Sequence, residues 1–184
     1  MLYVSLILES LRARPRLMFW TAALSQAVLW TLLPTLFYSA PAGDLPIVLA
    51  VGHEFQLGSD RGPPLAFWLA EIAYRLSGSM AGVYLLSQAC VVATLTGIFA
   101  LGRSTVGTAQ AMLAVLLMIG VGAMSVPTPE FGPAILAMPI WTMVLLQFWR
   151  AVGEGRSEYW IALAVGMGLL LLTTSLSWLF FVLL

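Results

Sequence analysis

The sequence predicts an all-α fold, a polytopic transmembrane helix bundle of about five spans with two short amphipathic helices in its first outer loop. The 184 residues are 61% hydrophobic and only 9% charged, and apolar runs recur along the whole chain. A soluble domain carries about 25% charged residues, which cover its water-facing surface. The composition therefore excludes a soluble domain, a disordered segment and a nucleic-acid-binding protein, which needs a basic face.

Five apolar runs are close in length to the roughly 20 residues that cross a hydrocarbon core. The polar residues inside them are uncharged, and a helix bundle can accommodate such residues. We predict a single transmembrane domain over residues 1–184, with a cytoplasmic segment at 1–16 and an outer loop at 39–79. The predicted spans cover residues 17–38, 80–101, 109–126, 133–148 and 160–184.

The distribution of arginine predicts the orientation in the membrane. All eight basic residues are arginine. Six of them lie in the N-terminal segment or in the loops on the same side of the membrane as that segment: Arg12, Arg14, Arg16, Arg103, Arg150 and Arg156. Cytoplasmic loops carry an excess of basic residues. We therefore expect a cytoplasmic N-terminus and place the other loops on the opposite, outer side.

The long outer loop is predicted to contain two interfacial helices. Apolar residues recur at helical spacing over residues 45–57 and again over residues 64–76, which is typical of short amphipathic helices at a membrane surface. In the second segment, Glu71 and Arg75 lie one turn apart and form a predicted i,i+4 ion pair. Gly78 is predicted to end this helix.

Two carboxylates stand at the predicted outer surface. Asp44 follows the first span, and Glu130 lies in the short loop before the fourth. A carboxylate there can act as a general base or hold a divalent cation against a phosphate. The alternatives are structural, because Asp44 is placed to cap the helix that begins at Leu45 and Glu130 suits the positive end of the following helix. The residues alone leave both interpretations open.

Three further polar residues of the outer loop are candidates for binding a substrate or carrier phosphate. Arg61 can bind a phosphate bidentately, or it can pair with Asp60. His53 and Glu54 are candidates for the same role, or they belong to the polar face of the first amphipathic helix. A His-based metal site is excluded because His53 is the only histidine, and the single cysteine excludes a thiol metal cluster.

The outer-loop residues resemble those of the GT-C-type glycosyltransferases that use lipid-linked sugars, which include the protein O-mannosyltransferase-like and aminoarabinose-transferase-like families. In these families an acid follows the first span, an interfacial helix comes next, and a His-Pro-Pro-Leu motif starts a second helix. The resemblance rests on Asp44, on the run from Arg61 to Leu69, which contains Pro-Pro-Leu, and on Thr128-Pro129-Glu130, which is similar to a second outer acidic loop.

The resemblance implies transfer of a hexosyl or pentosyl group from a polyprenyl-phosphate carrier to an acceptor on the non-cytoplasmic side. Asp44 matches the first-loop acid and Glu130 the second, so these are the candidate catalytic residues. Arg61 matches a basic residue near the carrier phosphate, with His53 and Glu54 as further candidates for binding the substrate. The cofactor is unknown at this point, with a divalent cation as the candidate, and the bacterial inner membrane is the expected location.

The sequence also departs from the pattern of these families. Gly62 stands where histidine is usual, Leu45 where a second acid often follows the first, and Ser175 where lysine is common. Family members are several times longer, so we expect an N-terminal portion or a natural truncation. The rival hypothesis is a non-catalytic transmembrane subunit that packs against protein partners in a larger complex. A small transporter is disfavoured because the predicted spans carry no mid-membrane ionisable residue.

Overall fold

The computed structural model describes residues 14–41, 43–121, 124 and 128–175, and over these residues the chain is helical. The elements are α2 (Pro15–Phe37), α3 (Leu45–His53), α4 (Leu65–Ser77), α5 (Met80–Thr105), α6 (Thr108–Ile119), α7 (Pro133–Phe148), a π-helical turn η2 (Trp149–Gly153) and α8 (Tyr159–Leu171). The described part of the chain contains no strand, only an isolated bridge between Ser59 and Gly62. The predicted all-α bundle is confirmed.

Within the described residues, three helices are long and apolar enough to cross a membrane: α2, α5, and α7 continued through η2. The other two apolar helices, α6 and α8, are shorter. The predicted third span runs on through residues 122–123 and 125–127, and the predicted fifth through 176–184, which lie outside the described residues, as do residues 1–13. The exact limits of the spans stay a prediction.

The helix α5 is the centre of the bundle, because it packs against α2, α4, α6 and α7. Small residues let the helices approach closely, as is usual between membrane helices. A side chain at Gly97 of α5 would collide with Thr142 of α7, and one at Gly102 would collide with Ala111 of α6. Gly166 of α8 lies equally close to Val144 of α7.

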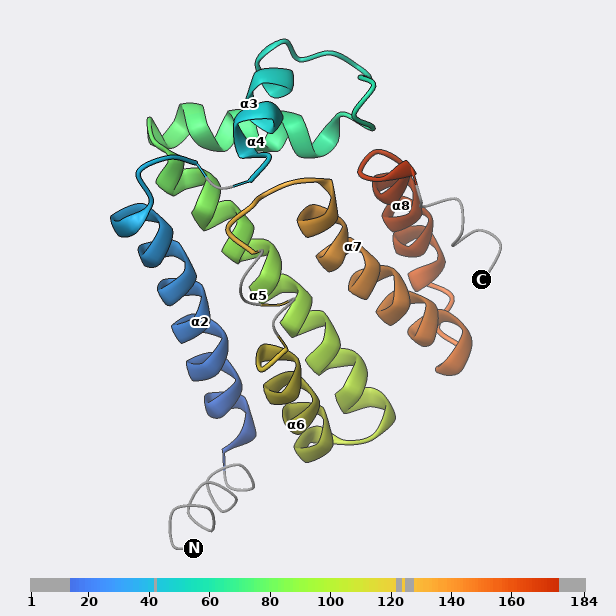
Figure 1. Cartoon of the computed structure of the whole chain (residues 1–184). Coiled ribbons are helices and arrows are strands. Elements are labelled where there is room, and N and C mark those ends of the chain that lie inside the picture. Colours follow the sequence, from blue (N-terminus) through green and yellow to red (C-terminus); the bar gives the residue numbers. More distant parts are fainter. Residues whose placement is uncertain (1–13, 42, 122–123, 125–127, 176–184) are drawn as a thin grey trace, which may run out of the picture.

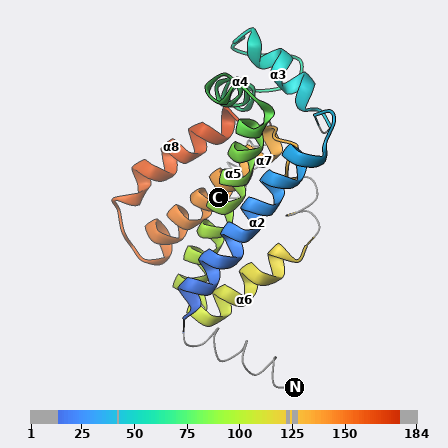
Figure 2. The same ribbon diagram turned by 90° about the vertical axis from the view of Figure 1, so that its left-hand side faces the viewer.

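The helices α3 and α4 lie across one end of the bundle (Figure 1), and the view turned by 90° shows the same arrangement (Figure 2). The end of α8 reaches this layer, where the backbone N–H of Leu65 donates to the carbonyl of Leu172 at 3.2 Å. The predicted interfacial helices are therefore present as helices. The first ends at His53 rather than at residue 57, because Phe55 takes a left-handed conformation with φ +48°.

The face that α4 buries is made of small residues and one acid. Ala66, Phe67, Ala70 and Glu71 are buried, whereas Ile72 and Leu76, two of the apolar residues at helical spacing over residues 64–76, are exposed. In a membrane protein this is physically reasonable, since large apolar side chains can face lipid while small ones allow close helix packing. The end of α4 is as predicted, with Gly78 at φ +65° and its N–H donated to Tyr74.

Candidate active site

A cavity of about 290 Å³ opens beneath α3 and α4, at the end of the bundle where these helices lie. It brings together three of the predicted site residues, Asp44, Arg61 and Glu130. Its apolar walls come from α3, α4, the beginning of α7 and the loop before it, and include Leu45, Val48, Phe67 and Phe131, which are buried. Two carboxylic acids and one guanidinium thus share a cavity whose other walls are largely apolar.

Asp44 stands at the N-cap position of α3, but its carboxylate makes no capping hydrogen bond. Its backbone carbonyl accepts the N–H groups of Ile47 and Val48, both at 3.0 Å. The structural alternative for this residue, a side-chain cap, is therefore wrong. The side chain is exposed and lines the cavity.

Glu130 lies against the backbone just before Asp44, because the residue there is a glycine. Gly43 has φ +55°, and a Cβ at this position would collide with the carboxylate of Glu130. The left-handed conformation and the close approach both favour glycine. This contact explains how two acids that are distant in sequence come to line one cavity.

The loop that carries Glu130 is anchored to α5 by buried hydrogen bonds. The hydroxyl of Ser87 donates to the carbonyl of Thr128, and Gln88 Nε2 donates to Thr128 Oγ1 at 3.0 Å. All three residues are at most 1% exposed. A polar group buried in the bundle is costly unless it is paired, so these bonds hold Thr128 and the loop after it in place.

Arg61 sits in a tight turn that Ser59 and Gly62 close. The N–H of Gly62 donates to the carbonyl of Ser59 at 3.0 Å, and the N–H of Arg61 donates to Ser59 Oγ at 3.3 Å. Gly62 has φ +125°, which a residue with a side chain rarely adopts. The glycine that departs from the family motif is thus required by this turn. Among the described residues, no ion pair joins Arg61 to Asp60.

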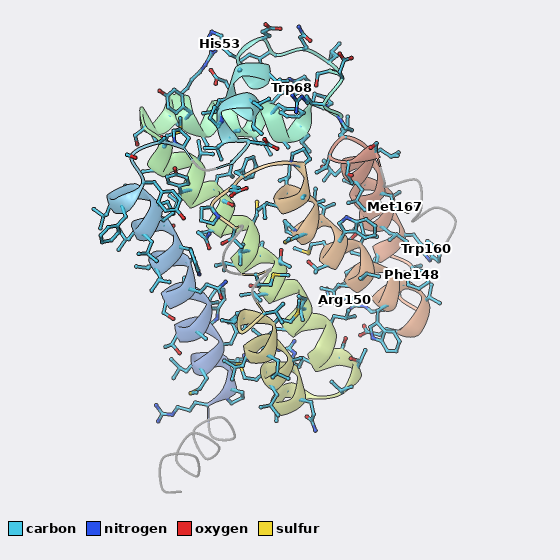
Figure 3. All side chains as sticks on the ribbon, viewed as in Figure 1. His53, Trp68, Phe148, Arg150, Trp160 and Met167 are labelled. Atoms are coloured by element: carbon cyan, nitrogen blue, oxygen red, sulfur yellow. The ribbon has the colours of Figure 1, made fainter. Side chains whose placement is uncertain are left out.

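His53 and Glu54 do not line the cavity. His53 Nδ1 lies 3.0 Å from Glu71 Oε1, and Glu54 accepts a hydrogen bond from Gln56. His53 is at the α3 layer, far from Arg150 at the opposite end of the bundle (Figure 3). Binding of substrate by His53 and Glu54 stays a prediction, and neither residue lines the cavity.

The sequence interpretation missed the burial of Glu71. Its predicted ion pair with Arg75 is confirmed, with Arg75 Nε 2.6 Å from Glu71 Oε1, but the Glu71 side chain is only 5% exposed. Burial raises the pKa of Glu71, while hydrogen bonds and charges from Arg75 and His53 lower it, and the net direction is below the usual value. The only signal in the sequence was the small residues Ala66 and Ala70 that share its buried face.

In the part of the chain that the structure describes, no group of three or more His, Cys, Asp or Glu side chains is placed to hold a metal ion. The cavity offers two carboxylates, from Asp44 and Glu130. Mg²⁺ is commonly held by one or two carboxylates together with substrate phosphates. The cavity therefore supplies two carboxylates, and the other ligands of such a cation would have to come from a phosphorylated substrate or water.

Comparison with known families identifies the family of the chain. The sequence model of the dolichyl-phosphate-mannose-protein mannosyltransferase family matches residues 61–184. The chain belongs to this family. It is a GT-C glycosyltransferase-like integral membrane protein, as the resemblance of its outer loop predicted. The matched region contains Arg61 and Glu130, whereas Asp44, His53 and Glu54 precede it. No curated protein and no solved structure is significantly similar to the chain.

Proposed function

We propose that this mannosyltransferase-family chain transfers a sugar from a polyprenyl-phosphate carrier to an acceptor in the cavity beneath α3 and α4. The observation that carries the proposal is the meeting of Asp44, Arg61 and Glu130 in one cavity. An acid, a second acid and a guanidinium are the groups that such a transfer needs. The membrane-embedded helices below the cavity supply the apolar surroundings for a polyprenyl chain.

In the proposed reaction, Arg61 binds the carrier phosphate, since a guanidinium pairs with phosphate oxygens bidentately. The acceptor hydroxyl attacks the anomeric carbon while the bond between that carbon and the phosphate oxygen breaks. Asp44 takes the proton of the hydroxyl as general base, and the electron pair of the broken bond stays on the carrier phosphate. Arg61 stabilises the charge that develops there.

Glu130 is the second carboxylate of the proposed site, and it has two roles to fill. Its carboxylate can accept hydrogen bonds from sugar hydroxyls next to Asp44. Together with Asp44 and the carrier phosphate, it can also complete the ligand set of a divalent cation, which would neutralise phosphate charge. Asp44 and Glu130 are the residues that would hold such a cation.

The proposed orientation puts the cavity on the non-cytoplasmic side of a bacterial inner membrane. Arg14 immediately precedes α2, Arg103 lies in the last turn of α5, and Arg150 and Arg156 lie at and after η2. The beginning of α2 and the ends of α5 and η2 lie at the end of the bundle away from the α3 and α4 layer (Figure 1). Since basic residues mark the cytoplasmic side, the N-terminus would be cytoplasmic.

The first test measures binding of the carrier. The full chain in lipid nanodiscs is exposed to a photoreactive polyprenyl phosphate, and labelling is competed with unlabelled polyprenyl phosphate or polyprenol. We expect phosphate-dependent labelling that falls about tenfold in Arg61→Gln, because a charge-assisted contact contributes about 1.5–3 kcal/mol. Arg156→Gln, at the other end of the bundle, is the matched control. Labelling that polyprenol competes equally well would contradict the proposal.

The second test measures transfer. Membranes that contain the chain receive polyprenyl-phosphate [¹⁴C]mannose, and labelled products are separated from the carrier. We expect Asp44→Asn to lower transfer by about 10²- to 10⁴-fold, as for loss of a general base, while carrier labelling is retained. Full transfer in Asp44→Asn would show that Asp44 is not the general base. A chain that shows neither labelling nor transfer, yet purifies in a stoichiometric complex, would favour the non-catalytic subunit.

A further inference from the structure

We infer that Glu71 is a positioning residue, a buried carboxylate that fixes the end of α3 on α4 and thereby places Asp44 relative to Arg61. The inference rests on the proposed function, because it concerns the geometry of the same cavity. Glu71 itself does not line the cavity. It would act through α3, because Asp44 immediately precedes the first residue of this helix.

The contacts of Glu71 join the two helices through one oxygen. Oε1 lies 2.6 Å from Arg75 Nε on its own helix and 3.0 Å from His53 Nδ1 at the end of α3. The Glu71 side chain is 5% exposed, against 53% for Arg75 and 72% for His53. A buried carboxylate must be hydrogen-bonded to be tolerated, so separating α3 from α4 at this point leaves an acid with one fewer partner.

The backbone at the end of α3 is built for close contact with α4. A Cβ at Gly52 would collide with the backbone carbonyl of Phe67 and would lie 3.1 Å from the Glu71 Cβ. Glycine at this position therefore lets α3 approach α4 closely enough for His53 to reach Glu71. The two short helices are packed along this contact and not only joined by the loop between them.

The residues that follow α3 also contact α4. Phe55 adopts φ +48°, a conformation that is strained for a side chain of this size. Its ring lies against the guanidinium of Arg75, 5.1 Å from centroid to Cζ. Trp68 Nε1 donates to the carbonyl of Gln56 at 3.1 Å. The strained turn is thus held in place by α4, through the same arginine that contacts Glu71.

The helix α3 is short, so a movement of its C-terminal end also moves its N-terminal end. Its nine residues span about 13 Å at 1.5 Å per residue. Its C-terminal end is attached to Glu71, its buried face contributes Leu45 and Val48 to the cavity, and Asp44 precedes its first residue. A tilt of α3 at the Glu71 end therefore displaces Asp44, whereas Arg61 belongs to a separate turn. Displacing a catalytic group by about 1 Å can lower a rate by about 100-fold.

The test first measures the position of α3 directly, without any substrate. In a Cys90→Ser background, spin labels at Ala50 of α3 and Val106 at the far end of α5 report the position of α3 by pulsed electron spin resonance. A second pair, Leu76 of α4 and Val106, reports the position of α4. All three labelled positions are exposed, and none lines the cavity.

We expect Glu71→Gln and Glu71→Leu to broaden the Ala50–Val106 distance distribution about twofold and to leave the Leu76–Val106 distribution unchanged. Glutamine can preserve one of the two hydrogen bonds. The leucine variant keeps the side chain buried and removes both bonds, so it tests the inference in that case as well. Glu158→Gln, which removes an exposed partner of Arg156, is the control and should change neither distance. A change in both distances would indicate general unfolding and would overturn the inference.

The second measurement is kinetic. In the Glu71 variants we expect transfer to fall about 10- to 100-fold in kcat, with KM for the carrier changed less than twofold because Arg61 is unaffected. Unchanged distances in both variants overturn the positioning role alone and leave the proposed function standing. Absence of carrier labelling and transfer from the unaltered chain overturns the proposed function, and the catalytic consequence of Glu71 with it.

Discussion

The two ends of the helix bundle carry similar charged residues in very different surroundings. At the α3 and α4 end, Glu71 is buried and bonded to Arg75 and His53. At the opposite end, Arg156 pairs with Glu158 and lies over the ring of Tyr159, but the Arg156 and Glu158 side chains are 49% and 63% exposed. The two clusters therefore differ in burial, and exposed ion pairs contribute little to stability.

The same contrast extends to glycines and hydroxyl groups. Gly43 and Gly155 both have positive φ, but only Gly43 has a neighbour, the carboxylate of Glu130, within reach of an added Cβ. Ser87 bonds across the bundle to the Glu130 loop, whereas Ser104 bonds to Leu101 in its own helix. Each feature near the cavity therefore has a counterpart at the other end that can serve as its control.

The largest effect on stability is expected for Glu71. Glu71→Gln removes the charge that balances Arg75 in a buried setting, and we expect a loss of about 2 kcal/mol in the free energy of unfolding. The half-exposed guanidinium of Arg75 can still be hydrated, which keeps the loss below that of a fully buried pair. The measurement is reversible unfolding in detergent, followed by circular dichroism. A loss below about 0.5 kcal/mol, which is the usual range for surface substitutions, would contradict the importance of burial.

The second effect separates backbone strain from contact with the site. Gly43→Ala and Gly155→Ala should each cost about 1 kcal/mol, because both place a side chain at positive φ. Only Gly43→Ala must also displace Glu130, so only this variant should lower sugar transfer. Equal transfer by the two variants, at equal expression, would show that the approach of Glu130 to Gly43 is not needed.

The third effect concerns the loop that carries Glu130. Ser87→Ala removes a buried hydrogen bond to Thr128, and we expect a loss of about 1 kcal/mol together with faster amide exchange over residues 128–132. Ser104→Ala, whose hydroxyl bonds only within its own helix, should change neither quantity. Identical exchange rates in the two variants would contradict the anchoring role of Ser87.

The fourth effect follows from the pKa of Glu71. Because this pKa is lowered from its usual value of 4.5 in the folded protein, the ionised form contributes stability above that value. The contribution is lost as the pH falls through the folded pKa, since protonation then favours the unfolded state. The stability difference between the unaltered chain and Glu71→Gln should therefore shrink progressively as the pH falls below about 4.5. A stability difference that stays constant into that range would show that Glu71 is not ionised.

The smallest effect is expected at the exposed pair. Glu158→Gln should leave the unfolding midpoint of the chain unchanged, because solvent and salt screen the attraction between exposed charges. The measurement is the same unfolding transition at low and high salt. A clear shift at low salt would show that this end of the bundle depends on its charges, and the contrast between the two ends would then be lost.

Some of the candidate site could be predicted because its signals are local. Asp44 after an apolar run, the Pro-Pro-Leu helix start and an acid in a short loop are all read from a few neighbouring residues. The family model matches residues 61–184, a range that contains Arg61 and Glu130, and the roles of all the candidate residues stay predictions. In contrast, the capping role of Asp44 was a local alternative that the folded chain does not use.

The sequence by itself determined the membrane-helical class, the positions of most helices and the end of α4 at Gly78. These depend on composition, on apolar periodicity and on the conformational freedom of glycine, which act over one or two helical turns. Only the tertiary structure decided that Asp44, Arg61 and Glu130 share a cavity and that Glu71 is buried between helices. Burial and long-range contact depend on how separate helices pack against each other, and no periodicity within a single helix specifies that.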